Sequence, residues 1–172
     1  GGGEMKQDPG AAEGTRHGWE RAPGNNSALV AWELLGESPE YERSSAEILE
    51  PLYRQAGNFQ KLIGVHEVQV RNASDPLRKV ELLHQVAMLY SDAAGDLKAA
   101  FETLARALRE DPSSEATQQG LERLARSTGR LPDLARVFEE LAAEQQDPHI
   151  GSALYAWPLT IAAILLFVQP VK

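Results

Sequence analysis

Side chains that could perform acid–base or metal chemistry are scattered along this sequence. The four histidines, His17, His66, His84 and His149, include no pair four residues apart with a neighbouring glutamate, so the zinc-binding helix of metalloproteases is absent. There is no cysteine, which excludes disulfides, thiolate nucleophiles and cysteine-based zinc sites. We therefore expect no metal and no cofactor. The sequence gives no sign of an enzyme or of a small-molecule substrate.

The acidic and histidine side chains have simpler structural interpretations. Glu139, Glu140 and Glu144 fall opposite the apolar stripe of an expected helix, which indicates a solvated face rather than an acid–base pair. His66 occupies a position where helical repeats often place a large apolar residue. We expect it to be a half-buried, hydrogen-bonded histidine rather than a ligand or a base.

The charge balance argues against a nucleic-acid partner. The formal net charge is −8 and the isoelectric point is about 5.0, whereas phosphate backbones are bound by clustered positive charge. Arg123, Arg126 and Arg130 lie close together, but Glu122 and Asp133 are interleaved with them. This group predicts a solvated helix face.

The elements that would position any site are amphipathic helices. Residues 76–112 read as two such helices joined at Gly95, where a turn needs a permissive backbone. The apolar stripe of the second helix is Leu97, Ala100, Phe101, Leu104 and Leu108. The stripe of the first is Leu83, Val86, Ala87 and Tyr90. Neither helix can bury its stripe alone, so each must pack on its neighbours.

The helix–glycine–helix unit recurs along the chain. The joining glycines are Gly57, Gly95 and Gly129, which lie 38 and 34 residues apart. Each unit closes with an Asp-Pro pair, at residues 75–76, 111–112 and 147–148, where proline prevents the preceding helix from continuing. A period of this length is typical of a helical solenoid.

The middle unit resembles the tetratricopeptide repeat. The residues that carry the resemblance are Tyr90, Gly95, Ala100, Ala107, Leu108 and Pro112, and those from Gly95 onward have the family's spacing. The segment from Tyr90 to Gly95 is one residue longer than the pattern, and Leu83 replaces the hallmark tryptophan. The chain is thus similar to the degenerate repeats of large bacterial proteins. The resemblance implies an all-α fold, a right-handed superhelical stack of antiparallel helix pairs (a TPR-like α-solenoid).

Three regions follow from this pattern. Residues 1–26 form a glycine-rich segment with too few apolar residues to fold. Residues 27–148 hold the repeats. Residues 149–172 form a hydrophobic tail, which carries no charge between residues 150 and 171. The tail could anchor the chain in a membrane, cap the end of the stack, or be foreign to the natural sequence. The expected location is therefore either cytoplasmic or membrane-associated.

The resemblance also implies a binding surface, because the first helix of each tetratricopeptide pair lines a concave groove. The positions that correspond to the groove are Glu47, Arg54, Gln55, Glu81, His84, Met88, Asp92, Gln119, Arg123 and Arg126. Any one of them could equally be an ordinary exposed residue. The implied function is a protein–protein interaction scaffold or adaptor that holds a peptide or a partner helix. The alternatives are a membrane-tethered assembly factor and a fragment of a larger repeat protein in which these repeats are a spacer.

Overall fold

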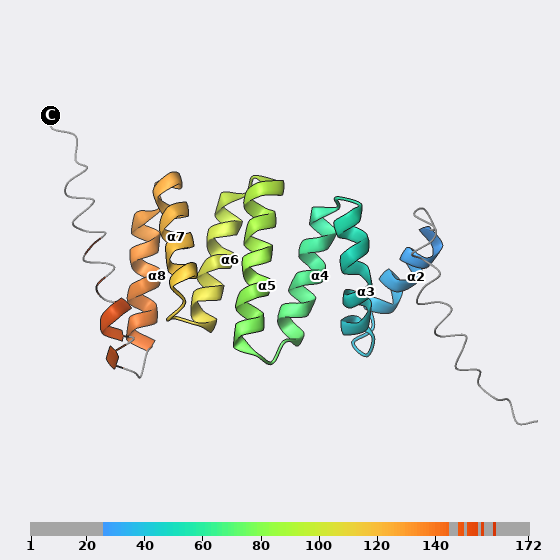
Figure 1. Cartoon of the computed structure of the whole chain (residues 1–172), viewed down its shortest axis with the longest axis horizontal. Coiled ribbons are helices and arrows are strands. Elements are labelled where there is room, and N and C mark those ends of the chain that lie inside the picture. The colour runs from blue at the N-terminus through green and yellow to red at the C-terminus, as the bar shows by residue number, and fades with distance from the viewer. Residues whose placement is uncertain (1–25, 145–147, 150, 155, 157–159, 161–172) are drawn as a thin grey trace, which may run out of the picture. The chain divides into compact units, whose positions relative to one another are not determined.

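The structure is a computed structural model that describes residues 26–144, 148, 149, 151–154, 156 and 160 of the 172-residue chain. Within these residues the protein is helical and has no strand (Figure 1), which confirms the expected all-α class. The elements are α2 (Asn26–Gly36), α3 (Glu42–Gln55), α4 (Phe59–Asn72), α5 (Pro76–Met88), η1 (Leu89–Ala94), α6 (Leu97–Glu110), α7 (Glu115–Thr128) and α8 (Leu131–Glu144). The predicted N-terminal segment before residue 26 and most of the hydrophobic tail lie outside the described residues.

The chain forms two compact units, which meet in the sequence between Leu49 and Glu50. The described part of the first unit contains α2 and the beginning of α3. Several large apolar side chains of α2 are exposed, among them Val30 at 48% and Leu34 at 61%, whereas Leu49 of α3 is buried. The second unit contains the end of α3 and all helices from α4 to α8, and it holds most of the buried core.

Side-chain caps begin the four α-helices α4 to α7 of the second unit. The oxygens that accept a hydrogen bond from the first turn belong to Asn58 for α4, Asp75 for α5, Asp96 for α6 and Ser114 for α7. Each cap satisfies a backbone N–H that has no partner inside its helix. The first Asp-Pro pair begins a helix, whereas the sequence pattern suggested that it would end the one before it. Pro76 is the first residue of α5, a position at which the backbone N–H has no partner inside the helix and proline is therefore tolerated.

The three joining glycines have the left-handed backbone that the sequence pattern requires. Gly57, Gly95 and Gly129 have φ of 65°, 66° and 69°, and among the described residues only glycines have positive φ. At two of these turns the N–H of the residue after the glycine donates to a carbonyl five residues earlier: Asn58 to Tyr53 and Arg130 to Ala125. This bond is the Schellman closure of a helix C-terminus.

The turn at Gly95 contains one residue more than the other two. Here Asp96 N–H donates to the carbonyl of Tyr90, six residues earlier, at 2.8 Å. The intervening segment η1 is π-helical, which is the form that a helix takes when one residue is inserted into it. The additional residue between Tyr90 and Gly95, the main departure from the tetratricopeptide spacing, is therefore absorbed by a wider turn rather than by a loop.

Two glycine-to-alanine substitutions should change stability in opposite directions. A Cβ at Gly129 or at Gly64 would meet no atom within 4 Å, so packing does not distinguish the two sites. We expect Gly129→Ala to lower the free energy of unfolding by about 1–2 kcal/mol, because the Cβ of alanine is sterically crowded in a left-handed backbone conformation. Gly64→Ala, inside α4, should raise it by about 0.5–1 kcal/mol. Urea denaturation followed by circular dichroism measures both values, and shifts of equal sign would contradict the assignment.

Helices α4 to α8 lie side by side in chain order (Figure 1), and consecutive helices pack on each other. The larger core joins α6, α7 and α8. Its buried residues are Phe101, Ala105, Leu108, Leu121, Ala125, Leu134, Val137, Phe138, Leu141, Ala142 and Leu154. A smaller cluster joins α4, α5 and α6 through Val70, Leu82, Leu83 and Ala107. The sequence pattern missed Leu82, which is 1% exposed, and wrongly placed Leu97 in the buried stripe, since it is 39% exposed at the start of α6.

Polar contacts also join alternate helices. Arg106 of α6 makes two hydrogen bonds to Glu67 of α4, at 2.7 and 2.9 Å. Arg109 of α6 lies 3.5 Å from Glu140 of α8. The even-numbered helices α4, α6 and α8 are thus linked to one another in sequence order. Helices α5 and α7 are linked by a separate contact, described below.

Candidate interaction surface on α5 and α7

Three of the predicted groove residues are engaged by neighbours on their own helix. Arg54 Nη2 donates to Glu50 at 2.8 Å. Arg78 Nη1 donates to Glu81 at 3.0 Å. In α7, Arg126 Nε donates to Glu122 Oε1 at 2.9 Å. Such exposed pairs three or four residues apart contribute at most about 0.5 kcal/mol each, so a partner could still compete for these side chains.

Glu47 belongs to the first unit, unlike the other predicted groove residues. It pairs with Arg43 at 3.4 Å, and both side chains are mostly exposed. The described residues of that unit add no further predicted site residue. The interaction surface considered below is therefore built from the second unit alone.

His84 joins α5 to α7. Its Nε2 shares a hydrogen bond of 2.8 Å with Oγ1 of Thr117, and Thr117 is fully buried. The half-buried position of His84 lowers the pKa of its imidazole, because burial disfavours the charged form. His84 was predicted as a groove contact, and the structure shows it bonded to another helix. Thr117 was missed, because nothing in the sequence relates it to a histidine 33 residues earlier.

Thr117 also receives the cap of α7. Ser114 Oγ and Thr117 Oγ1 share a hydrogen bond of 2.8 Å, and Ser114 Oγ accepts from the N–H of Thr117 at 3.4 Å. The start of α7 and the middle of α5 are thus fixed by one hydroxyl group. These hydrogen bonds therefore fix α5 and α7, and the exposed residues that they carry, relative to each other.

The remaining predicted positions are exposed, and one of them, Asp92, is hydrogen-bonded to its neighbour in the chain. Met88 ends α5 with its side chain 58% exposed. Gln119 and Arg123 are exposed one helical turn apart on α7, and Arg123 has no ion pair within the part of the chain that the structure describes. Gln55 is exposed at the end of α3. Asp92 lies in η1, where it accepts a hydrogen bond from Ser91 at 2.7 Å.

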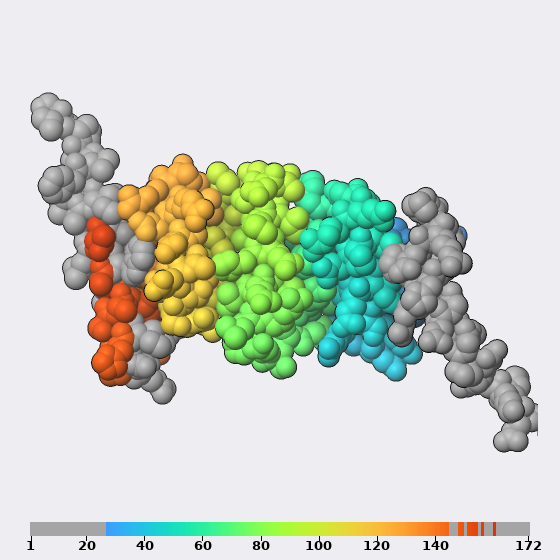
Figure 2. Space-filling view, in the orientation of Figure 1, coloured from blue at the N-terminus to red at the C-terminus, as the bar shows by residue number. Residues whose placement is uncertain are grey.

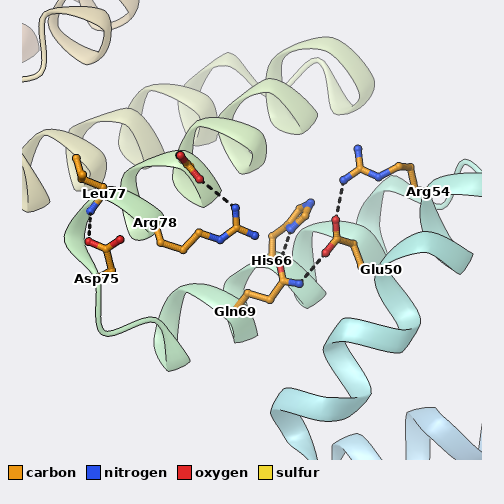
Figure 3. Close-up of polar contacts among 8 residues, drawn as sticks. Glu50, Arg54, His66, Gln69, Asp75, Leu77 and Arg78 are labelled. Carbon is orange, nitrogen blue, oxygen red and sulfur yellow. Dashed lines mark hydrogen bonds and ion pairs between the residues drawn. The ribbon is translucent and has the colours of Figure 1, made fainter.

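A polar chain links α3 to α4 within the second unit (Figure 3). Gln69 Nε2 donates to Glu50 Oε2 at 2.7 Å, while Arg54 donates to the other oxygen of the same carboxylate. Since the amide nitrogen of Gln69 faces a carboxylate, its oxygen is the acceptor, and Nδ1 of His66 is the donor at 2.8 Å. Burial raises the pKa of Glu50, but the hydrogen bonds from Gln69 and Arg54, together with electrostatic contributions from neighbouring groups, outweigh this effect, and the net pKa is lowered.

This chain corrects the prediction for His66. The imidazole is 1% exposed rather than half-buried, and its Nε2 has no hydrogen-bond partner among the described residues. One nitrogen of the ring is therefore satisfied and the other is not. The imidazole is thus connected to α3 through Gln69 and Glu50, which lie 19 residues apart.

The described residues contain no group of three or more histidine or acidic side chains that could hold a metal ion. Within the same part of the chain, no helix has both the length and the apolar character needed to cross a membrane. The predicted membrane segment, residues 150–171, lies mostly outside the described residues. Neither observation bears on the segments that the structure does not describe.

Comparison with protein families, with curated proteins and with solved structures finds no match for this chain.

Proposed function

We propose that this protein is an interaction scaffold that holds a segment of a partner protein on the surface of α5 and α7. The observation that carries the proposal is the pair of uncommitted side chains on two helices joined by His84 and Thr117. Met88 is mostly exposed, and Arg123 has no ion pair within the described residues. Exposed apolar and charged groups on a preformed surface bind at a low entropic cost, because little has to be ordered.

The chemistry of the two side chains suggests the kind of partner. Arg123 suits a carboxylate, with which a guanidinium forms paired hydrogen bonds. Met88 suits an apolar side chain, because its flexible thioether adapts to irregular surfaces. The partner would thus present an acidic and an apolar residue along an extended or helical segment.

The arrangement of the helices is part of the same proposal. The links between alternate helices are those expected of stacked antiparallel pairs, and the left-handed glycines recur at the joint of each pair. These observations support the tetratricopeptide-like solenoid, with its right-handed superhelix, that the sequence resemblance implies. In such a stack α5 and α7 would be the first helices of successive pairs and would face the groove.

The test is affinity capture from the source lysate with the full chain as bait, compared with two charge-reversed variants. Arg123→Glu changes the proposed surface. Lys98→Glu, at a side chain that is 75% exposed on α6, makes the same change in charge elsewhere. We expect the partner to be captured by the parent chain and by Lys98→Glu, and to be lost with Arg123→Glu.

Two outcomes would contradict the proposal. If Arg123→Glu retains every partner that the parent chain captures, the binding surface lies elsewhere. If the folded parent chain captures no partner at all, the repeats act as a spacer rather than as a binding module. Circular dichroism of each variant establishes that the bait is folded.

A further inference from the structure

A cavity of about 350 Å³ lies on the side of the second unit that is formed by α6 and α8. Four arginines and only three carboxylates line it, although the whole chain has a net charge of −8. The arginines are Arg106, Arg109, Arg130 and Arg136. The charge of this cavity is therefore opposite in sign to that of the molecule.

Arg130 is the most constrained of the four. Its guanidinium lies 4.6 Å from the centre of the Phe101 ring, a cation–π distance, and its Nε donates to Asp133 Oδ2 at 2.8 Å. Its Nη1 is buried and has no hydrogen-bond partner among the described residues. Burying an N–H without an acceptor is costly, so a group that supplied one would bind favourably.

Asp133 is shared between two cations. Its second oxygen, Oδ1, accepts a hydrogen bond from Arg136 Nη2 at 2.8 Å. The hydrogen bond from Arg130 is the main reason that the pKa of Asp133 is lowered, with the charges of both arginines adding to it. One negative charge is thus set against two positive charges at this end of the cavity.

The other two arginines are balanced by single carboxylates. Glu67 accepts two hydrogen bonds from Arg106. Arg109 has the longer contact, since its Nη2 lies 3.5 Å from Oε2 of Glu140. The surplus of donors therefore lies with Arg130 and Arg136, while Arg109 is held loosely enough to turn toward a ligand.

We propose that this cavity binds a phosphate group, carried either by a small molecule or by a phosphorylated side chain of a peptide. A phosphate offers several acceptor oxygens and up to two negative charges, which matches two guanidiniums that share one carboxylate, one of which, that of Arg130, has an unpaired buried donor. The volume lies near the lower end of the range for small-molecule sites, about 300–1,000 Å³. The site uses none of the residues of the α5–α7 surface and does not depend on the function proposed for it.

The experiment is calorimetric titration of the full chain with inorganic phosphate, with O-phosphoserine and with a short phosphoserine peptide, at constant ionic strength. The unphosphorylated peptide is the control. We expect one saturable site for the phosphorylated probes and none for the control. A peptide that binds more tightly than O-phosphoserine would identify a side chain as the source of the phosphate, and equal affinities would identify a small molecule.

Four variants distinguish binding at this cavity from nonspecific attraction of phosphate to positive charges on the protein. Arg136→Gln, at a side chain that is 65% exposed, should fold normally and weaken phosphate binding by about fivefold. Asp133→Asn should strengthen binding, because it removes the negative charge and leaves a single acceptor oxygen for the two guanidiniums. Arg78→Gln on α5 and Arg123→Gln on α7 remove the same charge at residues that do not line the cavity and should leave the affinity unchanged.

The proposal is overturned if no phosphorylated probe saturates the parent chain, or if Arg136→Gln and Arg78→Gln weaken binding equally. Retention of the phosphate site in Arg123→Gln also separates this result from the partner capture described above, so failure of one proposal leaves the other standing.

Discussion

Phe138→Ala should lower the free energy of unfolding by about 3–5 kcal/mol, the range for truncating a buried phenylalanine. Phe138 is fully buried on α8 and belongs to the cluster that joins α6, α7 and α8. Its removal would leave a cavity where the three helices meet, in a domain whose total stability is expected to be about 5–15 kcal/mol. Urea denaturation monitored by circular dichroism measures the loss.

Two further variants make that result interpretable. Phe138→Leu keeps most of the apolar volume and should fold even if alanine does not, with a loss smaller than that of Phe138→Ala. Met88→Ala removes an apolar side chain that is 58% exposed and should cost no more than about 0.5 kcal/mol. A loss below about 1 kcal/mol for Phe138→Ala would show that α8 does not pack on α6 and α7 as described.

Thr117→Val should lower the free energy of unfolding by about 1–3 kcal/mol, although it preserves the shape of the side chain. The hydroxyl of Thr117 is bonded to His84 and to Ser114, and valine would leave these polar groups without that partner. The same denaturation measurement applies. The effect reports directly on the contact between α5 and α7 that the proposed interaction surface depends on.

Thr128→Val is the matched control, because Thr128 lies on the same helix and its hydroxyl bonds only to the carbonyl of Leu124, four residues earlier. It should change stability by no more than about 0.5 kcal/mol. A double variant with His84→Leu should cost less than the sum of the two single changes, since both partners of the bond are then removed together. Strict additivity would mean that His84 and Thr117 do not interact.

Much of the local structure could be predicted from the sequence. The left-handed turns at Gly57, Gly95 and Gly129 follow from glycine's freedom at positive φ, and the helices between them follow from the apolar periodicity. The additional residue before Gly95 was also visible in the sequence. Its accommodation as a π-helical turn was not, because a loop or a shifted helix end would have fitted the same count.

The contacts between residues far apart in the sequence, including those that define both candidate sites, were not predictable in the same way. The bonds of Thr117 to His84 and of Gln69 to Glu50, and the stacking of Arg130 on Phe101, each join residues 19 or more positions apart. They depend on how each helix is rotated about its axis against its neighbours, which apolar periodicity leaves uncertain by about a residue. That uncertainty is also why His66 was expected to be half-buried and is fully buried.

The sequence by itself therefore determined the helices, their joints and their order, because these depend on residues a few positions apart. Only the tertiary structure decided which polar side chains are satisfied inside the protein and which are left for a ligand. Arg123 and Arg130 look alike in the sequence, as neighbours in one cluster of arginines. Packing leaves the first exposed on α7 and places the second against Phe101 with one buried nitrogen unpaired. The difference arises because burial and hydrogen bonding depend on residues from other helices.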